Sequence, residues 1–293
     1  MKTVLFHANC PDGAAAAWAA WKVLGEAKYI PVNYGQPIPE IPDGSEVYVL
    51  DFSYPAADLI ELHARMERLV VLDHHASAQA DLAAIHFTLP SLIYFDMARS
   101  GAVLAWEYFH PDEPVPEILE YVQDRDLWEW KLPKSREVSA ALQMRGWTNE
   151  TFDKIHLVPL EIDKLKQEGE LILKFKNAQV EIMAKNHRFA YLNTAKRMIR
   201  FTEKLEPGGD GEPMVGPEIH IMPVANATVF FSEVGEKLLE MFPAFQCAAY
   251  YFDRKEGQRQ WGLRSREGFD CSLICKAFGG GGHKAAAGFV EAL

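Results

Sequence analysis

Three short apolar runs in the first third of the chain each stop abruptly at acidic residues or histidines. The runs cover residues 3–7, 47–51 and 69–75. Uninterrupted valine- and leucine-rich runs of this length are typical of strands buried on both faces, and hence of a parallel sheet. Ligands of such sheets bind beyond the carboxyl ends of the strands, so the polar ends of these runs predict a site at one sheet edge.

Helix-like segments alternate with these runs. Residues 14–23 are rich in alanine, residues 56–67 have apolar side chains at helical spacing, and further helices are predicted at 101–109 and 116–122. Alternating strands and helices predict a doubly wound α/β domain with a mostly parallel sheet over residues 1–150.

The second half of the chain has a different pattern. Residues 151–189 form a long, charged, amphipathic stretch with few helix breakers, and we expect a helical connector there. Residues 190–293 alternate short strands and turns, which predicts a smaller α/β domain, and the composition of residues 207–213 indicates a loop. Within this domain we expect helices at 231–241 and 272–278, and strands at 247–253, 260–265 and 287–290.

Charge and cysteine usage narrow the function classes. The formal net charge of −11 falls entirely on residues 1–150, because residues 151–293 carry equal numbers of acidic and basic side chains. A long groove for duplex DNA would need a basic face, so we expect no such partner. There is no apolar run long enough to span a bilayer, and the four cysteines lack the spacing of a disulfide framework. We therefore expect a cytoplasmic protein without a membrane partner.

The polar residues at the predicted edge come from four separate segments. Taken singly, an Asp in a turn or before a helix is an ordinary cap, and an acidic loop is ordinary surface. Together, imidazole and carboxylate groups suit Mn²⁺ and similar ions better than a thiolate zinc site. Two such ions would activate water and hold the oxygens of a phosphoryl group. The residues concerned are His7, Asp12, Asp51, Asp73, His74, His75, Asp124 and Asp126.

Two sets of motifs then resemble a known family. The run that ends in Asp73-His74-His75 is similar to the hallmark motif of the DHH phosphoesterase superfamily, and His7 to Gly13, Asp51 and Asp124 are similar to its other motifs in the same order. Residues 263–265 and 278–288 resemble the DHH-associated substrate-binding domain, which Asn226 and residues 232–237 also fit. The resemblance covers nearly the whole chain.

The resemblance implies a catalytic domain with two Mn²⁺ ions, Mg²⁺ or Co²⁺ being possible replacements, and a second lobe that closes over the substrate. Asp51 would bridge the two ions, Asp73 would orient a ligand, and His75 would contact the phosphate or assist the leaving group. The implied metal ligands are His7, Asp12, Asp51, His74 and Asp124. The implied substrate-binding residues are Asn226, Arg264, Ser265, Gly279, Gly280, Gly281, Gly282 and His283.

Two groups can also be interpreted from their chemistry alone. Four successive glycines would let backbone amides approach a phosphate, with His283 adding a donor and Arg264 a planar fork, although a glycine run can also be a flexible linker. Ser100, at the start of a predicted helix, either presents amides to a substrate anion or is a plain helix cap.

The first motif departs from the family pattern. One carboxylate of the family's usual pair is missing, because Cys10 or Ala14 stands in its place, depending on the alignment. We interpret Cys10 as an inert thiol in preference to a thiolate ligand, with Asn9 or water as alternatives for the missing ligand. Which ion Asp12 serves, and whether Asp124 or Asp126 is the ligand of the fourth motif, stay open.

These features favour a Mn²⁺-dependent phosphoesterase that acts on short oligonucleotides, linear dinucleotides or a nucleoside bisphosphate. The absence of a basic stripe favours such small substrates over long DNA. Two alternatives remain, namely a pyrophosphatase or polyphosphatase, and a catalytically weak nucleotide-binding protein. A homodimer is one possible assembly.

Overall fold

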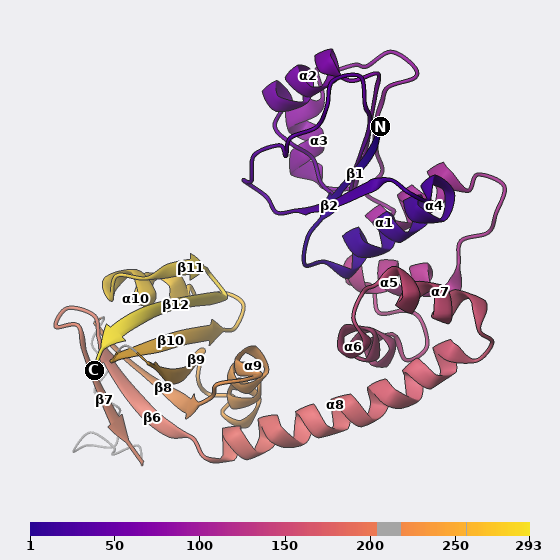
Figure 1. Ribbon diagram of the computed structural model, residues 1–293. Coiled ribbons are helices and arrows are strands. Elements are labelled where there is room, and N and C mark those ends of the chain that lie inside the picture. The colour runs from indigo at the N-terminus through magenta and orange to yellow at the C-terminus, as the bar shows by residue number, and fades with distance from the viewer. Residues whose placement is uncertain (204–217, 256) are drawn as a thin grey trace. The chain divides into compact units, whose positions relative to one another are not determined.

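The computed structural model describes residues 1–203, 218–255 and 257–293 and divides into two compact units (Figure 1). The first unit is Met1–Leu173 and the second is Lys174–Leu293, so the boundary falls inside the long helix α8 (Glu161–Lys185). The loop predicted at residues 207–213 lies outside the described residues. Among the described residues, none of the helices combines the length and the apolar character needed to cross a membrane.

The first unit is built on a five-stranded, wholly parallel sheet with the strand order β2-β1-β3-β4-β5. Strands β1, β3 and β4 are the three apolar runs of the sequence, whereas β2 and β5 escaped prediction because β2 contains a proline and β5 is short. The strands are β1 (Lys2–His7), β2 (Lys28–Val32), β3 (Glu46–Leu50), β4 (Arg68–Asp73) and β5 (Leu92–Phe95).

Helices cover both faces of this sheet, as expected for a doubly wound fold. Val4 lies in the core that contains the side chains of α1 (Pro11–Leu24) and α4 (Gly101–Phe109). Its neighbour Leu5 lies in the opposite core, beneath α2 (Ala56–Arg65) and α3 (Ala76–Leu82). Successive strand residues point to opposite faces, so burial of both explains why these strands are continuously apolar.

The expectation of one helix over residues 151–189 is wrong in detail. The structure has α7 (Asn149–Leu157) and then α8, separated by a turn at Pro159. A residue that precedes proline is pushed out of the helical region, and Val158 is extended accordingly, with φ −99° and ψ 117°. Residues 188–189 already belong to a strand. Two more helices, α5 (Glu117–Asp126) and α6 (Ser135–Arg145), complete the first unit.

The second unit has a seven-stranded mixed sheet in the order β11-β12-β10-β9-β8-β6-β7. Of its pairs, β8 and β9 run parallel, and the others antiparallel. Helix α9 (Phe231–Met241) packs with the end of α8 in one core, and α10 (Cys271–Ala277) lies in the other. Its strands are β6 (Arg188–Asn193), β7 (Met198–Thr202), β8 (Ile219–Asn226), β9 (Cys247–Arg254), β10 (Gln258–Ser265), β11 (Gly281–His283) and β12 (Ala286–Ala292). The α/β class predicted for the chain is therefore confirmed.

Candidate metal centre

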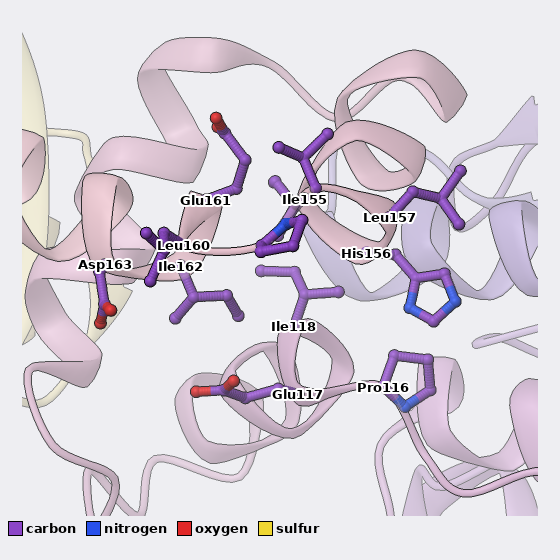
Figure 2. A pocket seen from close by; sticks show the side chains of 12 residues that line it. Pro116, Glu117, Ile118, Ile155, His156, Leu157, Leu160, Glu161, Ile162 and Asp163 are labelled. Atoms are coloured by element: carbon purple, nitrogen blue, oxygen red, sulfur yellow. The ribbon is translucent and has the colours of Figure 1, made fainter.

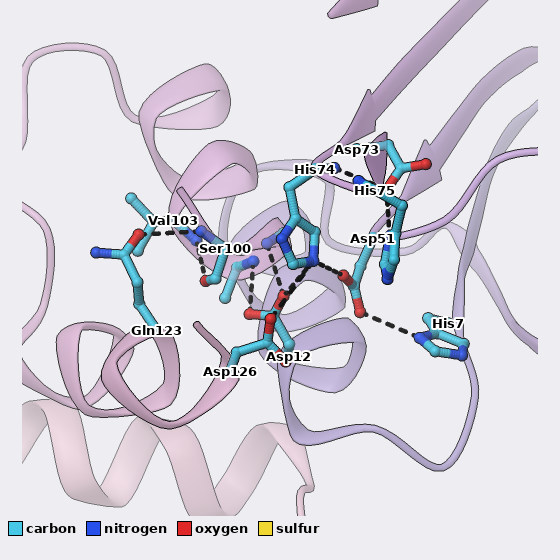
Figure 3. A network of polar contacts seen from close by, with 12 residues as sticks. His7, Asp12, Asp51, Asp73, His74, His75, Ser100, Val103, Gln123 and Asp126 are labelled. Carbon is cyan, nitrogen blue, oxygen red and sulfur yellow. Dashed lines mark hydrogen bonds and ion pairs between the residues drawn. The ribbon is translucent and has the colours of Figure 1, made fainter. Parts of the chain in front are cut away.

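The strand order of the first sheet reverses between β1 and β3, and the predicted polar residues gather there. His7 is the last residue of β1, Asp51 follows β3 directly, and Asp73 ends β4 and leads into His74 and His75. Figure 3 shows these side chains converging with Asp12 and Asp126. A reversal of this kind leaves a crevice at the carboxyl ends of the strands, which is where ligands bind in open α/β sheets.

Asp51 lies at the middle of this cluster. Its Oδ1 is 3.1 Å from His74 Nε2, and its Oδ2 is 3.4 Å from His7 Nδ1. The backbone is left-handed there, with φ +64°, and the side chain is only 1% exposed. Burial alone would raise the pKa of Asp51, but His7 and His74 outweigh it and hold the pKa below its ordinary value. The carboxylate thus presents one oxygen to each of two histidines.

Asp12 is held by the start of helix α4. Its two oxygens accept hydrogen bonds from the amides of Gly101 (2.6 Å) and Ala102 (3.0 Å), and Oδ2 lies 3.7 Å from His74 Nε2. Burial and the charges of Asp51 and Asp126 raise the pKa of Asp12 well above its usual value. A side chain at residue 101 would meet Asp51, since a Cβ there would lie 2.5 Å from that of Asp51.

This arrangement distinguishes between the two interpretations of Ser100. The anion at the start of α4 is the carboxylate of Asp12, not a substrate, because the Gly101 and Ala102 amides are already occupied. Ser100 is fully buried, and its hydroxyl accepts a hydrogen bond from the Val103 amide at 3.4 Å. It is therefore a plain helix cap.

Asp73 and His75 form a separate pair beside the cluster. Asp73 Oδ1 accepts from His75 Nδ1 (2.7 Å) and from two backbone amides, and Oδ2 accepts from the Ser53 hydroxyl at 2.6 Å. The bond with Asp73 raises the pKa of His75. Asp73 is buried, so it orients His75 from behind while the imidazole stays partly exposed.

The fourth motif delivers Asp126, rather than Asp124, to the cluster. Asp126 Oδ2 lies 3.5 Å from His74 Nε2, whereas the Asp124 carboxylate accepts hydrogen bonds from the amides of Lys131 (2.8 Å) and Leu132 (3.2 Å). Both residues are in the last turn of α5. They are two positions apart in the sequence, so their side chains point about 200° away from each other around the helix axis. Only one of them can therefore face the strand ends, and Asp124 instead fixes the loop after the helix.

Two further residues lie near the cluster. Cys10 was interpreted from the sequence as an inert thiol, and Tyr34 was not predicted. The sulfur of Cys10 lies with His7 and Asp51, whereas the Asn9 side chain is hydrogen-bonded to Asn33. Burial and the charge of Asp51 raise the pKa of the Cys10 thiol to about 12. Tyr34 was missed because strand β2, which ends two residues before it, was not recognised; its ring centroid lies 4.9 Å from that of His7.

The donors suit divalent cations. Three groups have ligand atoms within 4.8 Å of one another, and Asp51 and His74 each belong to two of them. Asp51 Oδ2 is a buried oxygen that receives no hydrogen bond from the described residues. Several carboxylates crowded into a buried site are costly unless cations neutralise them, so imidazole and carboxylate donors at this spacing fit a pair of divalent ions. The groups are His7–Cys10–Asp51, Asp51–His74–His75 and Asp12–His74–Asp126.

In the second unit, two predicted substrate-binding residues are engaged by the protein itself. Arg264 Nη2 donates to the Ser232 hydroxyl at 2.5 Å, and Ser265 Oγ donates to the carbonyls of Phe269 and Lys284. These bonds hold the loop that follows β10, so Ser265 has a structural role there. Asn226 and His283 are exposed, at the end of β8 and on β11.

The last two residues of the glycine run, Gly281 and Gly282, belong to strand β11, and the first two connect α10 to it. Gly279 and Gly282 have positive φ, and a Cβ on Gly280 would lie 2.1 Å from the Gly288 carbonyl oxygen. Gly281 has ordinary backbone and open space around its Cβ position. The fold therefore requires glycine at three of the four positions, and Gly281 has no such structural requirement.

A separate cavity of about 370 Å³ lies in the first unit between the start of α5, the end of α7 and the start of α8 (Figure 2). Its carboxylates are already paired: Glu161 with Arg145 and Lys164, and Glu117 and Asp163 with Lys166. It shares no residue with the histidine–carboxylate cluster.

Comparison with known proteins gives a relative in sequence and similar solved structures. The chain is 29% identical to the uncharacterized protein R106 of Acanthamoeba polyphaga mimivirus over 97% of its own length and 66% of that protein's length. It superposes on the pGpG-specific phosphodiesterase PggH of Vibrio cholerae with a TM-score of 0.50 and 13% identity, covering 100% of this chain and 93% of that one. RecJ of Thermus thermophilus in complex with Mn²⁺ gives a TM-score of 0.41 and 16% identity, covering 98% and 49%. No family model matches the chain.

Proposed function

We propose that the protein is a phosphoesterase of the DHH type that hydrolyses short oligonucleotides, linear dinucleotides or a nucleoside bisphosphate. The observation that carries this proposal is the convergence of Asp12, Asp51, His74 and Asp126 on the strand ends. The phosphodiesterase PggH, whose fold this chain shares along nearly its full length, acts on the dinucleotide pGpG, and this supports a small nucleotide substrate.

In this proposal His7, Asp12, Asp51, His74 and Asp126 would hold the ions. When bound, the ions supply an activated water and positive charge around the phosphoryl oxygens. Mn²⁺ is our choice for the position formed by Asp12, His74 and Asp126, since all three donors are imidazole or carboxylate.

The chain's own groups then account for orientation and proton movement. Asp12 is fixed by the α4 amides, so its geometry is set before any ligand arrives. Asp73 holds His75 through Nδ1, which leaves Nε2 as the nitrogen that can contact substrate. Because the pKa of His75 is raised, it carries a proton over a wider pH range and can donate it to the leaving oxygen.

The second unit contributes nucleotide binding in this proposal. Gly281 and His283 offer an amide and an imidazole on an exposed strand, and Asn226 offers an exposed amide side chain. Arg264 would have to leave its contact with Ser232 to reach a phosphate. In this proposal the first unit carries out the hydrolysis, and the second unit binds the nucleotide.

The test is a turnover panel with Mn²⁺. Purified protein is assayed on pGpG, pApA, a nucleoside 3′,5′-bisphosphate, pyrophosphate and polyphosphate, with Asp51→Asn as the inactive control. We expect hydrolysis of a dinucleotide or the bisphosphate that stops in excess chelator and returns with Mn²⁺. Turnover of pyrophosphate or polyphosphate alone, nucleotide binding without turnover, or full activity in chelator would each overturn the proposal.

A further inference from the structure

Cys10 directly precedes helix α1 and lies beside the histidine–carboxylate cluster. It is the cap residue of α1, and residues at this position usually accept a hydrogen bond from a helix amide through an oxygen atom. The Cys10 side chain makes no such bond. Instead its sulfur lies with a ring nitrogen of His7 and a carboxylate oxygen of Asp51, all within 4.8 Å of one another.

A second observation marks the same place as a ligand position. Asp51 is 1% exposed, and its Oδ2, which faces His7, receives no hydrogen bond from the described residues. Its ion-pair contact is His7 Nδ1 at 3.4 Å, itself a metal-ligating atom, so a cation bound by both groups would neutralise the carboxylate. Asn9, the other residue considered for the missing ligand, is hydrogen-bonded to Asn33.

We propose that Cys10 binds one of the two cations as a thiolate, together with His7 and Asp51. This inference rests on the metal centre of the proposed function and replaces our interpretation of Cys10 as an inert thiol. On binding, the S–H bond breaks, a sulfur–metal bond forms and the proton passes to solvent. One proton is therefore released from Cys10 for each cation bound at this position.

The two cation positions then differ in chemistry. Thiolate is a soft donor that favours Zn²⁺ or Co²⁺ over Mn²⁺ and Mg²⁺. The other position, formed by Asp12, His74 and Asp126, has only nitrogen and oxygen donors. A carboxylate at residue 10 would make the two positions alike, so the cysteine gives this chain a metal preference of its own.

The test uses Co²⁺ as a spectroscopic probe. Metal-free protein is titrated with Co²⁺, and absorbance is followed in the near ultraviolet, where thiolate-to-cobalt charge transfer absorbs. Zn²⁺ and Mn²⁺ affinities are measured in parallel by calorimetry in buffers of different ionisation enthalpy, which counts released protons. The variants are Cys10→Ser, Cys10→Asp and, as the matched control, Cys275→Ala, which removes a buried thiol of the second unit.

We expect a charge-transfer band in the wild type and in Cys275→Ala that is absent from both Cys10 variants. Zn²⁺ affinity should fall more than about tenfold in Cys10→Ser, which is the lower limit for loss of even an outer partner of a ligand. Cys10→Asp should shift the preference toward Mn²⁺. A wild type without the band, or a band that persists in Cys10→Ser, would overturn the inference.

The readout separates this inference from the proposed function. If the band forms but no phosphate ester is hydrolysed, the thiolate assignment stands and the phosphoesterase proposal fails. If metal-dependent hydrolysis occurs without the band, the reverse holds.

Discussion

Two groups of buried carboxylates in the first unit differ in whether the protein neutralises them. Glu161 is 1% exposed and lies between two cations, Arg145 Nη1 at 2.8 Å and Lys164 Nζ at 2.5 Å. Asp12, Asp51 and Asp126 are also largely hidden, but their ion-pair partners among the described residues are histidines alone. Permanently charged side chains neutralise Glu161, whereas the three aspartates have only histidines as ion-pair partners among the described residues.

The titration behaviour of the two groups follows from this difference. Lys164 and Arg145 lower the pKa of Glu161 to about 2, whereas burial and the charge of Asp51 raise the pKa of Asp12 and of Asp126. A carboxylate with a permanent counter-charge stabilises the fold as soon as it ionises. A carboxylate surrounded by other carboxylates stabilises the fold only when a bound cation neutralises it. This difference separates a ligand site from a structural ion pair.

The largest effect should come from Asp51→Asn. The substitution keeps the shape and suits the left-handed backbone at φ +64°, but it removes the charge of a carboxylate that belongs to two of the three ligand groups. We expect hydrolysis to fall at least about a thousandfold, with both ions lost. Bound metal measured by elemental analysis, alongside kcat, checks this. Loss of a single ion would show that Asp51 does not bridge.

The next effect distinguishes the two acids of α5. Asp126→Asn should empty one position and reduce kcat by about a hundredfold, because Asp126 touches His74. Asp124→Asn should retain both ions and cost about 1–2 kcal/mol of stability, because a neutral amide replaces the carboxylate that binds the amides of Lys131 and Leu132. The reverse order of metal loss would restore Asp124 as the ligand.

The first unit shows how far the sequence could predict the site. Three strands and their polar ends were visible because burial on both faces leaves an uninterrupted apolar run, and parallel pairing brings such ends together. The choice between Asp124 and Asp126 was not visible, since it depends on the rotation of α5 against the sheet. The two interpretations of Ser100 could not be separated, because nothing local reveals that Asp12, far away in sequence, occupies the α4 amides.

The second unit was harder to predict because its sheet is mostly antiparallel. Antiparallel strands do not gather their ends at one edge, so a motif there does not locate a site by topology alone. Arg264 illustrates this: its planar fork suggested a phosphate, but the structure places it against Ser232. The glycine run carried a clearer signal, although only the structure separates Gly281 from its three constrained neighbours.

A moderate effect on dinucleotide turnover is expected from His283→Ala, because substrate binding and hydrolysis are assigned to different units. Metal content should stay unchanged, and kcat/KM for a dinucleotide should fall about tenfold. A bis(p-nitrophenyl) phosphate substrate, which offers little to hold, should be affected less. Gly281→Val, which meets open space, serves as a second probe of the same strand. Metal loss in His283→Ala, or unchanged dinucleotide turnover, would contradict this division.

The smallest effect, on stability alone, tests the neutralised carboxylate directly. Glu161→Gln should cost about 1–3 kcal/mol at pH 7, since Arg145 and Lys164 lose their shared counter-charge. The folded-state pKa of about 2 lies below the ordinary 4.5, so the contribution is complete above pH 4.5 and disappears as pH falls toward 2. Urea unfolding of wild type and variant should therefore converge over this range.

Asp126→Asn, measured without metal, is the control of opposite sign. The raised pKa of Asp126 means that its charge destabilises the metal-free fold at neutral pH, so removing the charge should stabilise that form. The wild type should approach the variant as pH falls and Asp126 takes up its proton. If Glu161→Gln and Asp126→Asn both destabilised the metal-free protein at pH 7, the two groups of carboxylates would not differ as proposed, because the aspartates would then be held by the fold itself.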